Sequence, residues 1–378
     1  MKIINANAEL IETADHPYIM VERAGRTCYK SEDNITPESA TRFVKMMVKN
    51  GHLAMLEHAY IHIYCNMQVI CHLKNALSFA KNIYPSIDRY LIITEPTSDN
   101  NGIDMSAYGL VSGSLRTFYE LVTNNIYIDK LTPDYEIIGY INNFLAKIYP
   151  EVFSENTANY IDLTSIKQEN ISSIDSNLLI FRTNNMSEPE DDMILQVVTT
   201  NRLVNTYKTI TAADANITTL KSLLSSATMY EHIPHTLKFT CDRGVSHEFV
   251  RHRPASFAQE STRYCNYNKD KFGSEITVIK PVFFDEKSTN YQIWKEACES
   301  SEQAYMHLLH NGATAQEARS VLPNSLKTEL IITANEREWK HILDLRLRGT
   351  TGKPHPQMTE VMNIAAPILF KQSDNRLS

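Results

Sequence analysis

The sequence of 378 residues has little of what marks secreted, membrane-bound or nucleic-acid-coating proteins. Its six cysteines have neither the spacing of a paired metal site nor that of a disulfide framework. No apolar run approaches the length of a membrane-spanning helix, and no basic and apolar leader begins the chain. The formal net charge of −7 argues against bulk affinity for nucleic acid or anionic membranes. These absences predict a cytoplasmic protein without membrane or nucleic-acid partners.

The hydrophobic pattern predicts a mixture of strands and helices without regular βαβ alternation. Strands are expected at 2–11, 59–65, 236–241, 276–284 and 328–334. Helices are expected at 17–29, 37–49, 291–310, 314–321, 336–346 and 357–370. Further helices are expected at 106–122, 136–148 and 203–227. The predicted fold class is therefore α+β, with a mixed sheet wrapped by helices.

The densest cluster of functional side chains is the string RHRPASFAQESTRY at 251–264. It contains three arginines and several hydroxyl side chains, although the protein is acidic as a whole. A guanidinium offers a planar fork of donors that matches phosphate and carboxylate oxygens, and hydroxyls add neutral donors beside them. Taken alone, the tripeptide Arg251-His252-Arg253 could instead be a solvated basic turn on the surface. Residues i and i+2 of a helix point apart, so we expect the string to span a helix end and the loop beyond it.

The spacing of the whole string resembles RHRxxSxxxxSxRY, the signature of the flavin-dependent thymidylate synthases, also known as the thymidylate synthase complementing protein family. Three further segments of that family have counterparts here in the same order. They are GHxxxxEH at 51–58, EARxVLP at 317–323, and NxR followed by LR at 335–337 and 345–346. The resemblance implies the family's fold, enlarged by an insertion.

The resemblance also implies a reaction. Members convert dUMP to dTMP, taking the carbon from methylenetetrahydrofolate and a hydride from FAD that NADPH has reduced. The family is usually a homotetramer, so we expect an oligomer. FAD and dUMP both carry phosphates, which arginine binds well, and the flavin supplies the redox chemistry while the protein supplies position and charge.

Site residues follow by resemblance, position by position. The residues expected to contact FAD are Arg251, His252, Arg253, Gln259, Asn335, Arg337 and His341. Those expected around dUMP are Glu248, Arg251, Gln259, Glu260, Ser261, Arg263, Arg319 and Arg346. His52 is expected where folate or nicotinamide docks against the flavin.

Arg346 is the expected catalytic residue. Attack at C5 of the uracil needs negative charge to build on the ring, and a fixed guanidinium would stabilise that charge as an oxyanion hole does. Its alternative is a helix-terminal arginine that complements the macrodipole. Ser261 could be a nucleophile only with an adjacent base, so we assign it to the dUMP phosphate.

The resemblance divides the chain into a catalytic core, at 1–70 and 231–378, and an insertion at 71–230. The insertion is expected to be partly helical, with a polar loop near 153–192. Either Glu57-His58 or Glu231-His232 could fill the family's EH position, and the preceding Gly51-His52 favours the first pair. Glu248 stands where a glutamine is common. The group His52, His58 and His62 lacks carboxylate or thiol partners, so no metal is expected.

Two other function classes remain open. A nucleic-acid-binding protein would use the arginine cluster on phosphates and would bind with steep salt dependence. A paralogue without catalysis would bind dUMP or flavin and fail at methyl transfer. Flavin content separates the first class from the enzyme, and turnover separates the second.

Overall fold

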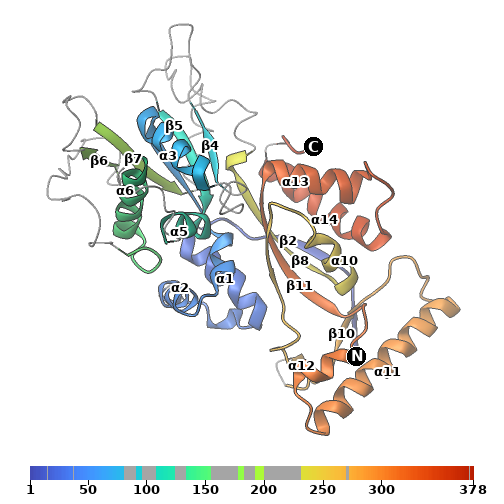
Figure 1. Cartoon of the computed structure of the whole chain (residues 1–378). Helices are drawn as coiled ribbons and strands as arrows, with labels where there is room; N and C mark the ends of the chain where they lie inside the picture. Colours follow the sequence, from blue (N-terminus) through green and yellow to red (C-terminus); the bar gives the residue numbers. More distant parts are fainter. Residues whose placement is uncertain are drawn as a thin grey trace. The chain divides into compact units, whose positions relative to one another are not determined.

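The computed structural model describes residues 1–14, 16–36, 38–80, 91–95, 108–123, 133–154, 178–182, 192–199, 231–269, 272–373 and 375–378. These residues form two compact units, drawn in Figure 1. The first unit contains Met1–Glu12, Glu22–Thr36 and His235–Ser378. The second contains Thr13–Val21 and Pro37–Pro234. Helix α1 (Pro17–Tyr29) begins in the second unit and ends in the first.

The first unit is built on a four-stranded sheet in the order β2-β8-β11-β9. Its strands are β2 (Asn7–Leu10), β8 (Pro234–Asp242), β11 (Lys327–Asn335) and β9 (Ser256–Gln259). β2 pairs antiparallel with β8, and β9 pairs antiparallel with β11. The two central strands are buried at nearly every position, although five of the nine residues in each are polar or charged. A separate parallel pair joins β1 (Lys2–Ile4) to β10 (Thr277–Ile279).

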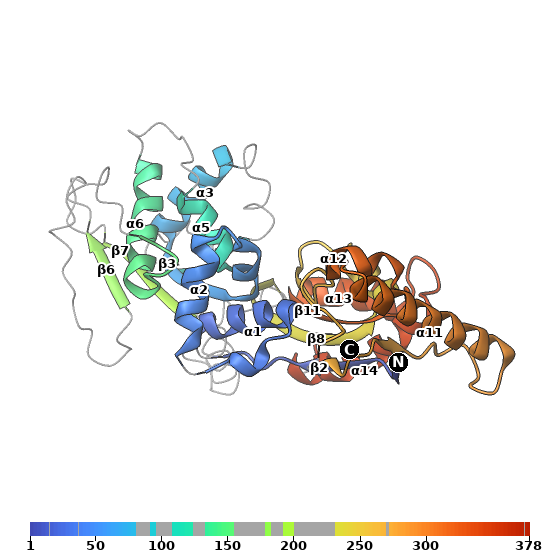
Figure 2. The ribbon, with the colours of Figure 1, turned by 90° about the horizontal axis from the view of Figure 1, so that it is seen from below.

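Helices of the first unit pack against these strands. They are α10 (Arg243–Phe249), α11 (Thr289–His310), α12 (Ala315–Ala318), α13 (Glu336–Leu343) and α14 (Pro356–Gln372), with short turns η1 (Glu32–Asn34), η5 (Arg319–Val321) and η6 (Asp344–Arg348). α13 contacts β11, and α14 contacts β2 (Figure 1). The long helix α11 lies beside α12 (Figure 2).

One apolar cluster joins the sheet to α10, α13 and α14. Its largest member is Trp339, which is fully buried and donates its indole N–H to the carbonyl oxygen of His235 at 2.9 Å. Phe239 of β8 stacks between Trp339 and Phe249, with ring centroids 6.3 and 4.7 Å away. This packing fixes the ends of α10 and α13 relative to one another, and both helices carry predicted site residues.

The second unit contains a five-stranded antiparallel sheet in the order β4-β5-β3-β7-β6. Its strands are β3 (Tyr60–Asn66), β4 (Ile92–Thr94), β5 (Tyr108–Ser114), β6 (Leu178–Arg182) and β7 (Asp192–Thr199). Every strand except β3 lies in the predicted insertion. The helices of this unit are α2 (Ser39–Lys49), η2 (Leu53–His58), α3 (Met67–Ala80), α5 (Leu115–Thr123) and α6 (Pro133–Ile148). Gly109 allows β5 to approach α3 closely, because a Cβ there would collide with Ile70 Cδ1.

Much of the expected secondary structure is confirmed. The α+β class is confirmed, as are the helices expected at 17–29, 37–49, 136–148, 291–310 and 357–370. The strands expected at 59–65, 236–241 and 328–334 are confirmed within about two residues at each end, the usual uncertainty of element boundaries. The helix expected at 203–227 lies outside the described residues, as does most of the loop expected near 153–192.

Several expectations were wrong in part. The segment expected as one helix at 106–122 is strand β5 followed by helix α5. Gly109 and Gly113 disfavour a helix there, and β5 instead satisfies its backbone groups by pairing with β3. The strand expected at 276–284 pairs only over Thr277–Ile279, and the one at 2–11 is divided into β1 and β2. Strand β6 occupies part of the expected polar loop.

No helix among the described residues combines the length and the apolar character that crossing a bilayer requires.

Two buried histidines of the second unit share one serine. Ser112 Oγ lies 2.7 Å from Nδ1 of His62 and 2.7 Å from Nδ1 of His232, whose Nε2 lies 2.7 Å from Thr94 Oγ1. A hydroxyl has a single proton to donate, so it donates to one imidazole and accepts from the other. Burial lowers the pKa of His62 to about 3, with a smaller contribution from His232, and burial lowers the pKa of His232 to about 4.

This network predicts acid sensitivity. The unfolded imidazoles titrate near 6.5, so at lower pH the unfolded chain binds protons that the folded chain does not. The stabilisation is complete above pH 6.5 and is lost as the pH falls toward the folded values. Each of these histidines should lower the free energy of unfolding by about 1.4 kcal/mol between pH 7.5 and pH 5.5. We expect His62→Gln to remove about half of the loss of unfolding free energy that this network causes, as measured by urea denaturation. His307 is exposed, so His307→Gln should not reduce the loss. An equal loss in wild type and His62→Gln would contradict the assignment.

Candidate active site

The RHR signature lies where the sequence predicted, at the end of a helix and in the loop beyond it. Asp242 caps α10 by accepting a hydrogen bond from the Val245 amide at 2.8 Å, and the helix ends at Phe249. Glu248 is therefore in the last turn. The His252 ring turns inward and is buried, while Arg251 and Arg253 are exposed.

Arg346 is held in one orientation by three hydrogen bonds. Its Nη1 donates to Glu248 Oε2 at 2.7 Å, and its Nη2 donates to the Glu248 carbonyl oxygen at 3.0 Å. Its Nε donates to Nε2 of His252 at 3.0 Å. The guanidinium thus joins the turn η6 to the end of α10. Its remaining N–H groups have no partner among the described residues.

The contact with Arg346 fixes the tautomer of His252. An arginine Nε–H can only donate, so Nε2 of His252 must be the acceptor and its proton must be on Nδ1. That N–H faces Glu338 Oε1 at 3.3 Å, which is a polar contact without good hydrogen-bond geometry. Glu338 Oε1 is consequently a buried carboxylate oxygen with no hydrogen-bond partner among the described residues.

Helix α13 positions Glu338 and His341 one turn apart. Asn335 caps the helix by accepting from the Glu338 amide at 2.9 Å, and Arg337 and His341 are exposed on it. Ligand atoms of His252, Glu338 and His341 lie within 4.8 Å of one another, a grouping that could hold a cation. The Arg346 contact opposes that use, because a protonated Nδ1 of His252 has no lone pair for a metal.

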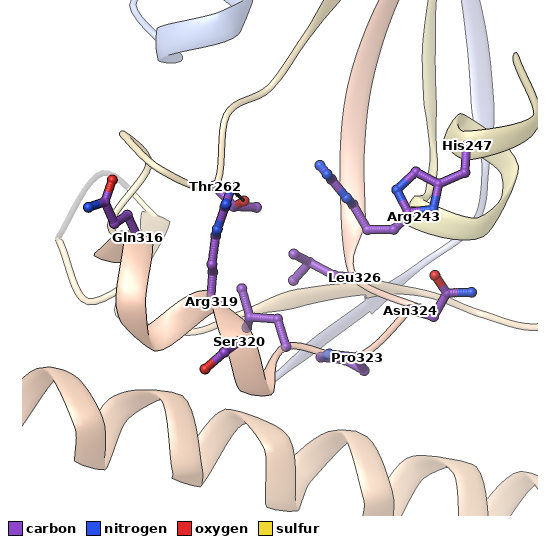
Figure 3. Close-up of a pocket in the computed structure, with 10 residues that line it drawn as sticks. Arg243, His247, Thr262, Gln316, Arg319, Ser320, Pro323, Asn324 and Leu326 are labelled. Carbon is purple, nitrogen blue, oxygen red and sulfur yellow. Dashed lines mark hydrogen bonds between the residues drawn. The ribbon is translucent and has the colours of Figure 1, made fainter. Parts of the chain in front are cut away.

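A cavity of about 700 Å³ is lined in part by α10 (Figure 3). Arg243 and His247 of α10 line one side, and Thr262 and Arg319 line the other. Arg319, at the start of η5, belongs to the segment that resembles EARxVLP and donates to Thr262 Oγ1 at 3.4 Å. No carboxylate lines this cavity among the described residues.

Three other predicted residues lie in or near β9 and the turn after it. Gln259 donates from Nε2 to Ser246 Oγ at 2.9 Å and to Thr328 Oγ1 at 3.1 Å, which joins β9 to α10 and β11. Ser261 Oγ accepts from the Arg263 amide at 3.3 Å. The exposed Arg263 side chain reaches Gln316 at 3.4 Å, on the rim of the cavity.

Comparison with known proteins decides the family. Residues 9–73 and 182–371 match the sequence pattern of the thymidylate synthase complementing protein family, Thy1, which is more than half of the chain. The chain belongs to this family. The resemblance inferred from the string at 251–264 is thereby confirmed.

Relatives in the family are named flavin-dependent thymidylate synthases. The protein from Pyrococcus abyssi is 34% identical over 118 residues, which is 31% of this chain and 48% of the relative. The one from Geobacter sulfurreducens is 34% identical over 124 residues, 32% and 52% of the two chains. The one from Corynebacterium aurimucosum is 30% identical over 159 residues, 38% and 61% of the two chains. The chain spans about half the length of the first two relatives.

Solved structures were also compared. The UMP/dUMP methylase PolB from Streptomyces cacaoi bound with 5-Br dUMP is 21% identical, with a TM-score of 0.33, covering 39% of this chain and 72% of that one. The same protein bound with 5-Br UMP is 23% identical, with a TM-score of 0.34, covering 39% and 74%.

Residues of the family's GHxxxxEH segment lie in the second unit. His52 is exposed and directly precedes η2. Glu57 forms an ion pair with Arg116 at 2.6 Å, and His58 is buried. The alternative pair, Glu231-His232, lies in the same unit, where His232 belongs to the buried serine network.

Glu260 occupies a different environment from the other predicted site residues. Its Oε2 pairs with Lys327 Nζ at 2.8 Å, and its Oε1 accepts from the Tyr267 hydroxyl at 3.2 Å. Lys327 also contacts Glu329, which two further lysines surround. Burial opposes the ionisation of Glu329, but the ammonium groups outweigh it and lower its pKa to about 2. This network gives both carboxylate oxygens of Glu260 a partner within the protein.

Residues that sequence reasoning missed line the site as well. Glu338 was overlooked although it stands three residues before His341, a spacing that places both on one helix face. Arg243 and His247 were overlooked although their spacing of four residues does the same on α10. Asn324, which follows the EARxVLP segment, could not be assigned from local pattern.

We expect Glu260→Gln to act on stability. Removing the Glu260 charge leaves Lys327 with Glu329 as its remaining carboxylate partner, so the free energy of unfolding should fall by about 2 kcal/mol in urea denaturation. The matched control is Glu286→Gln, which breaks the exposed pair with Lys280 and should cost no more than about 1 kcal/mol. Affinity for dUMP should stay at the wild-type value. Weaker dUMP binding with unchanged stability would restore Glu260 to the substrate site.

Proposed function

We propose that this protein is a flavin-dependent thymidylate synthase that methylates dUMP to dTMP. In this proposal methylenetetrahydrofolate provides the carbon, and FAD reduced by NADPH provides the hydride. The observation that supports it most is the orientation of Arg346 by Glu248 and His252 in a chain of this family. A guanidinium that is fixed before substrate arrives stabilises developing charge without the cost of reorganisation.

The residues near the signature fit a flavin dinucleotide in two respects. The exposed Arg251 has no ion pair or hydrogen bond from its side chain among the described residues, so its charge is available to a diphosphate. The buried Glu338 Oε1 lacks a donor, and a flavin ring carries an N–H group. The proposed FAD contacts are Arg251, His252, Arg253, Gln259, Glu338, Asn335, Arg337 and His341. When bound, the flavin supplies hydride transfer, and these side chains bind and orient it.

Arg346 is proposed to face the uracil edge that carries the negative charge which makes C5 nucleophilic. Glu248 and His252 act as its positioning residues, because they accept three of the five N–H donors of the guanidinium and leave the other two for substrate oxygens. A glutamate at position 248 is suited to this task, since its carboxylate forms a charge-assisted bond that an amide would form more weakly.

The other proposed assignments follow the family pattern. The remaining dUMP contacts are Arg251, Gln259, Ser261, Arg263 and Arg319, and His52 is proposed to dock folate or nicotinamide. We propose a homotetramer in the cytoplasm, without a nucleic-acid partner and without a resident metal. The segment 71–230 is proposed as an insertion into a core formed by 1–70 and 231–378.

The direct test is tritium release from C5-labelled dUMP by the purified protein. We expect release that requires FAD, NADPH and methylenetetrahydrofolate together, because the transfer at C5 displaces that hydrogen. Omitting each component in turn is the control. Flavin and dUMP binding without release would indicate a paralogue that has lost catalysis. If the protein neither binds flavin and dUMP nor releases tritium, the proposed function is contradicted. Steeply salt-dependent binding of DNA would then indicate a nucleic-acid-binding protein instead.

Arg346→Ala should separate binding from catalysis. We expect it to retain flavin and to lose about 100- to 1000-fold in turnover, the usual effect of removing one preorganised donor. Arg346→Lys should remain well below wild type, because an ammonium cannot bond Glu248 and His252 in the same planar fork. The matched control is Arg348→Ala, in the same turn but paired with Asp344. Turnover of Arg346→Ala equal to that of Arg348→Ala would remove Arg346 from the mechanism.

A further inference from the structure

The cavity beside α10 has an unusual balance of charge. Two guanidiniums, of Arg243 and Arg319, line it together with the imidazole of His247. The hydroxyls of Thr262 and Ser320 and the amide of Asn324 add neutral hydrogen-bonding groups. No acidic side chain among the described residues contributes to the lining. In an acidic protein, such a concentration of donors without acids indicates a site for an anion.

Arg243 is not occupied by the protein itself. Its guanidinium makes no ion pair or hydrogen bond with the described residues, whereas Arg346 and Arg376 are both bound to carboxylates. Among the residues that the structure describes, the Arg319 side chain makes only the 3.4 Å contact with Thr262 Oγ1. Figure 3 shows the Arg243 side chain extending from α10 into the space that faces Arg319. Two uncompensated cations therefore face one cavity.

The backbone around Arg243 is held firmly. Its amide donates to the Asn324 carbonyl oxygen at 3.0 Å, which fastens the start of α10 to the loop before β11. The next residue is Gly244, where a Cβ would lie 2.8 Å from Asn324 Nδ2 and 3.0 Å from Asp242 Oδ1. Glycine thus allows Asn324 to approach α10 closely.

We propose that this cavity is a phosphate-binding pocket in which Arg243 and His247 are ligands together with Arg319. Its ligand class is a phosphate monoester or diphosphate of a nucleotide, because two arginines can each approach phosphate oxygens with paired N–H donors. The choice of nucleotide rests on the proposed function, in which dUMP, NADPH and FAD all carry such groups. The proposal adds Arg243 and His247 to a site for which the family pattern indicates only Arg319.

The first experiment uses inorganic pyrophosphate as the probe, titrated calorimetrically into the full chain. We expect Arg243→Gln and Arg319→Gln each to weaken binding at least about tenfold, with Arg243→Lys recovering part of the loss. The matched control Arg348→Gln should bind as the wild type does. Circular dichroism checks that each variant is folded. Failure of the wild type to bind pyrophosphate, or equal binding by Arg243→Gln and the control, would overturn the proposal.

Competition then identifies the source of the phosphate. Each of dUMP, NADPH and FAD is compared with a partner that lacks every phosphate, namely deoxyuridine, reduced nicotinamide riboside and riboflavin. The compound that displaces pyrophosphate from the wild type while its partner does not is the ligand of the pocket. Displacement by none of the three would overturn the assignment to a nucleotide.

Tritium release keeps this proposal separate from the proposed function. In one outcome, the wild type releases tritium while Arg243→Gln keeps the wild-type KM for every nucleotide. That result would overturn the phosphate-binding pocket and leave the proposed function standing. Arg243-dependent binding of a phosphorylated nucleotide without any release would leave the pocket standing and overturn the function.

Discussion

The arrangement of the site depends on the fork that Arg346 makes with Glu248 and His252. These three hydrogen bonds connect the turn after α13 to the end of α10, two elements far apart in sequence. The same two helices are also joined through the apolar core, where Trp339 of α13 and Phe249 of α10 belong to one buried cluster. Because an arginine can only donate, the fork also fixes the proton of His252 on Nδ1 and directs it toward Glu338. The guanidinium of Arg346 thus fixes the positions of the Glu248 carboxylate and the His252 imidazole relative to itself.

Charge is distributed in two contrasting ways around this fork. In the network around Glu260 and Glu329, the lysines are paired with carboxylates. These charges therefore stabilise the fold and are not available to a ligand. Around α10, Arg243 and Arg319 have no carboxylate partner among the described residues, and Arg251 is exposed without one. Uncompensated arginines cost the folded protein some repulsion, and a phosphate would relieve it. The contrast separates structural charges from charges available for binding.

Sequence reasoning reached the family, the α+β class and the position of the signature, because those depend on local patterns and fixed spacing. It could not see that α13 ends at Leu343 and continues as a π turn at Asp344–Arg348. Such a turn depends on tertiary contacts, here those of Arg346 with α10. It likewise could not see the ion pair of Glu260, because the lysine that pairs with it stands 67 residues away. Sequence reasoning was least complete where the partner of a side chain is distant in sequence.

A crystal structure of the protein with FAD and dUMP would test the central claim most directly. The account predicts that Arg346 keeps its bonds to Glu248 and His252 and that its remaining N–H groups lie within hydrogen-bonding distance of a uracil oxygen. The flavin should lie on the same side, with a donor supplied to Glu338 Oε1. A uracil bound away from Arg346, or an Arg346 that leaves Glu248 and His252 when dUMP binds, would contradict the account.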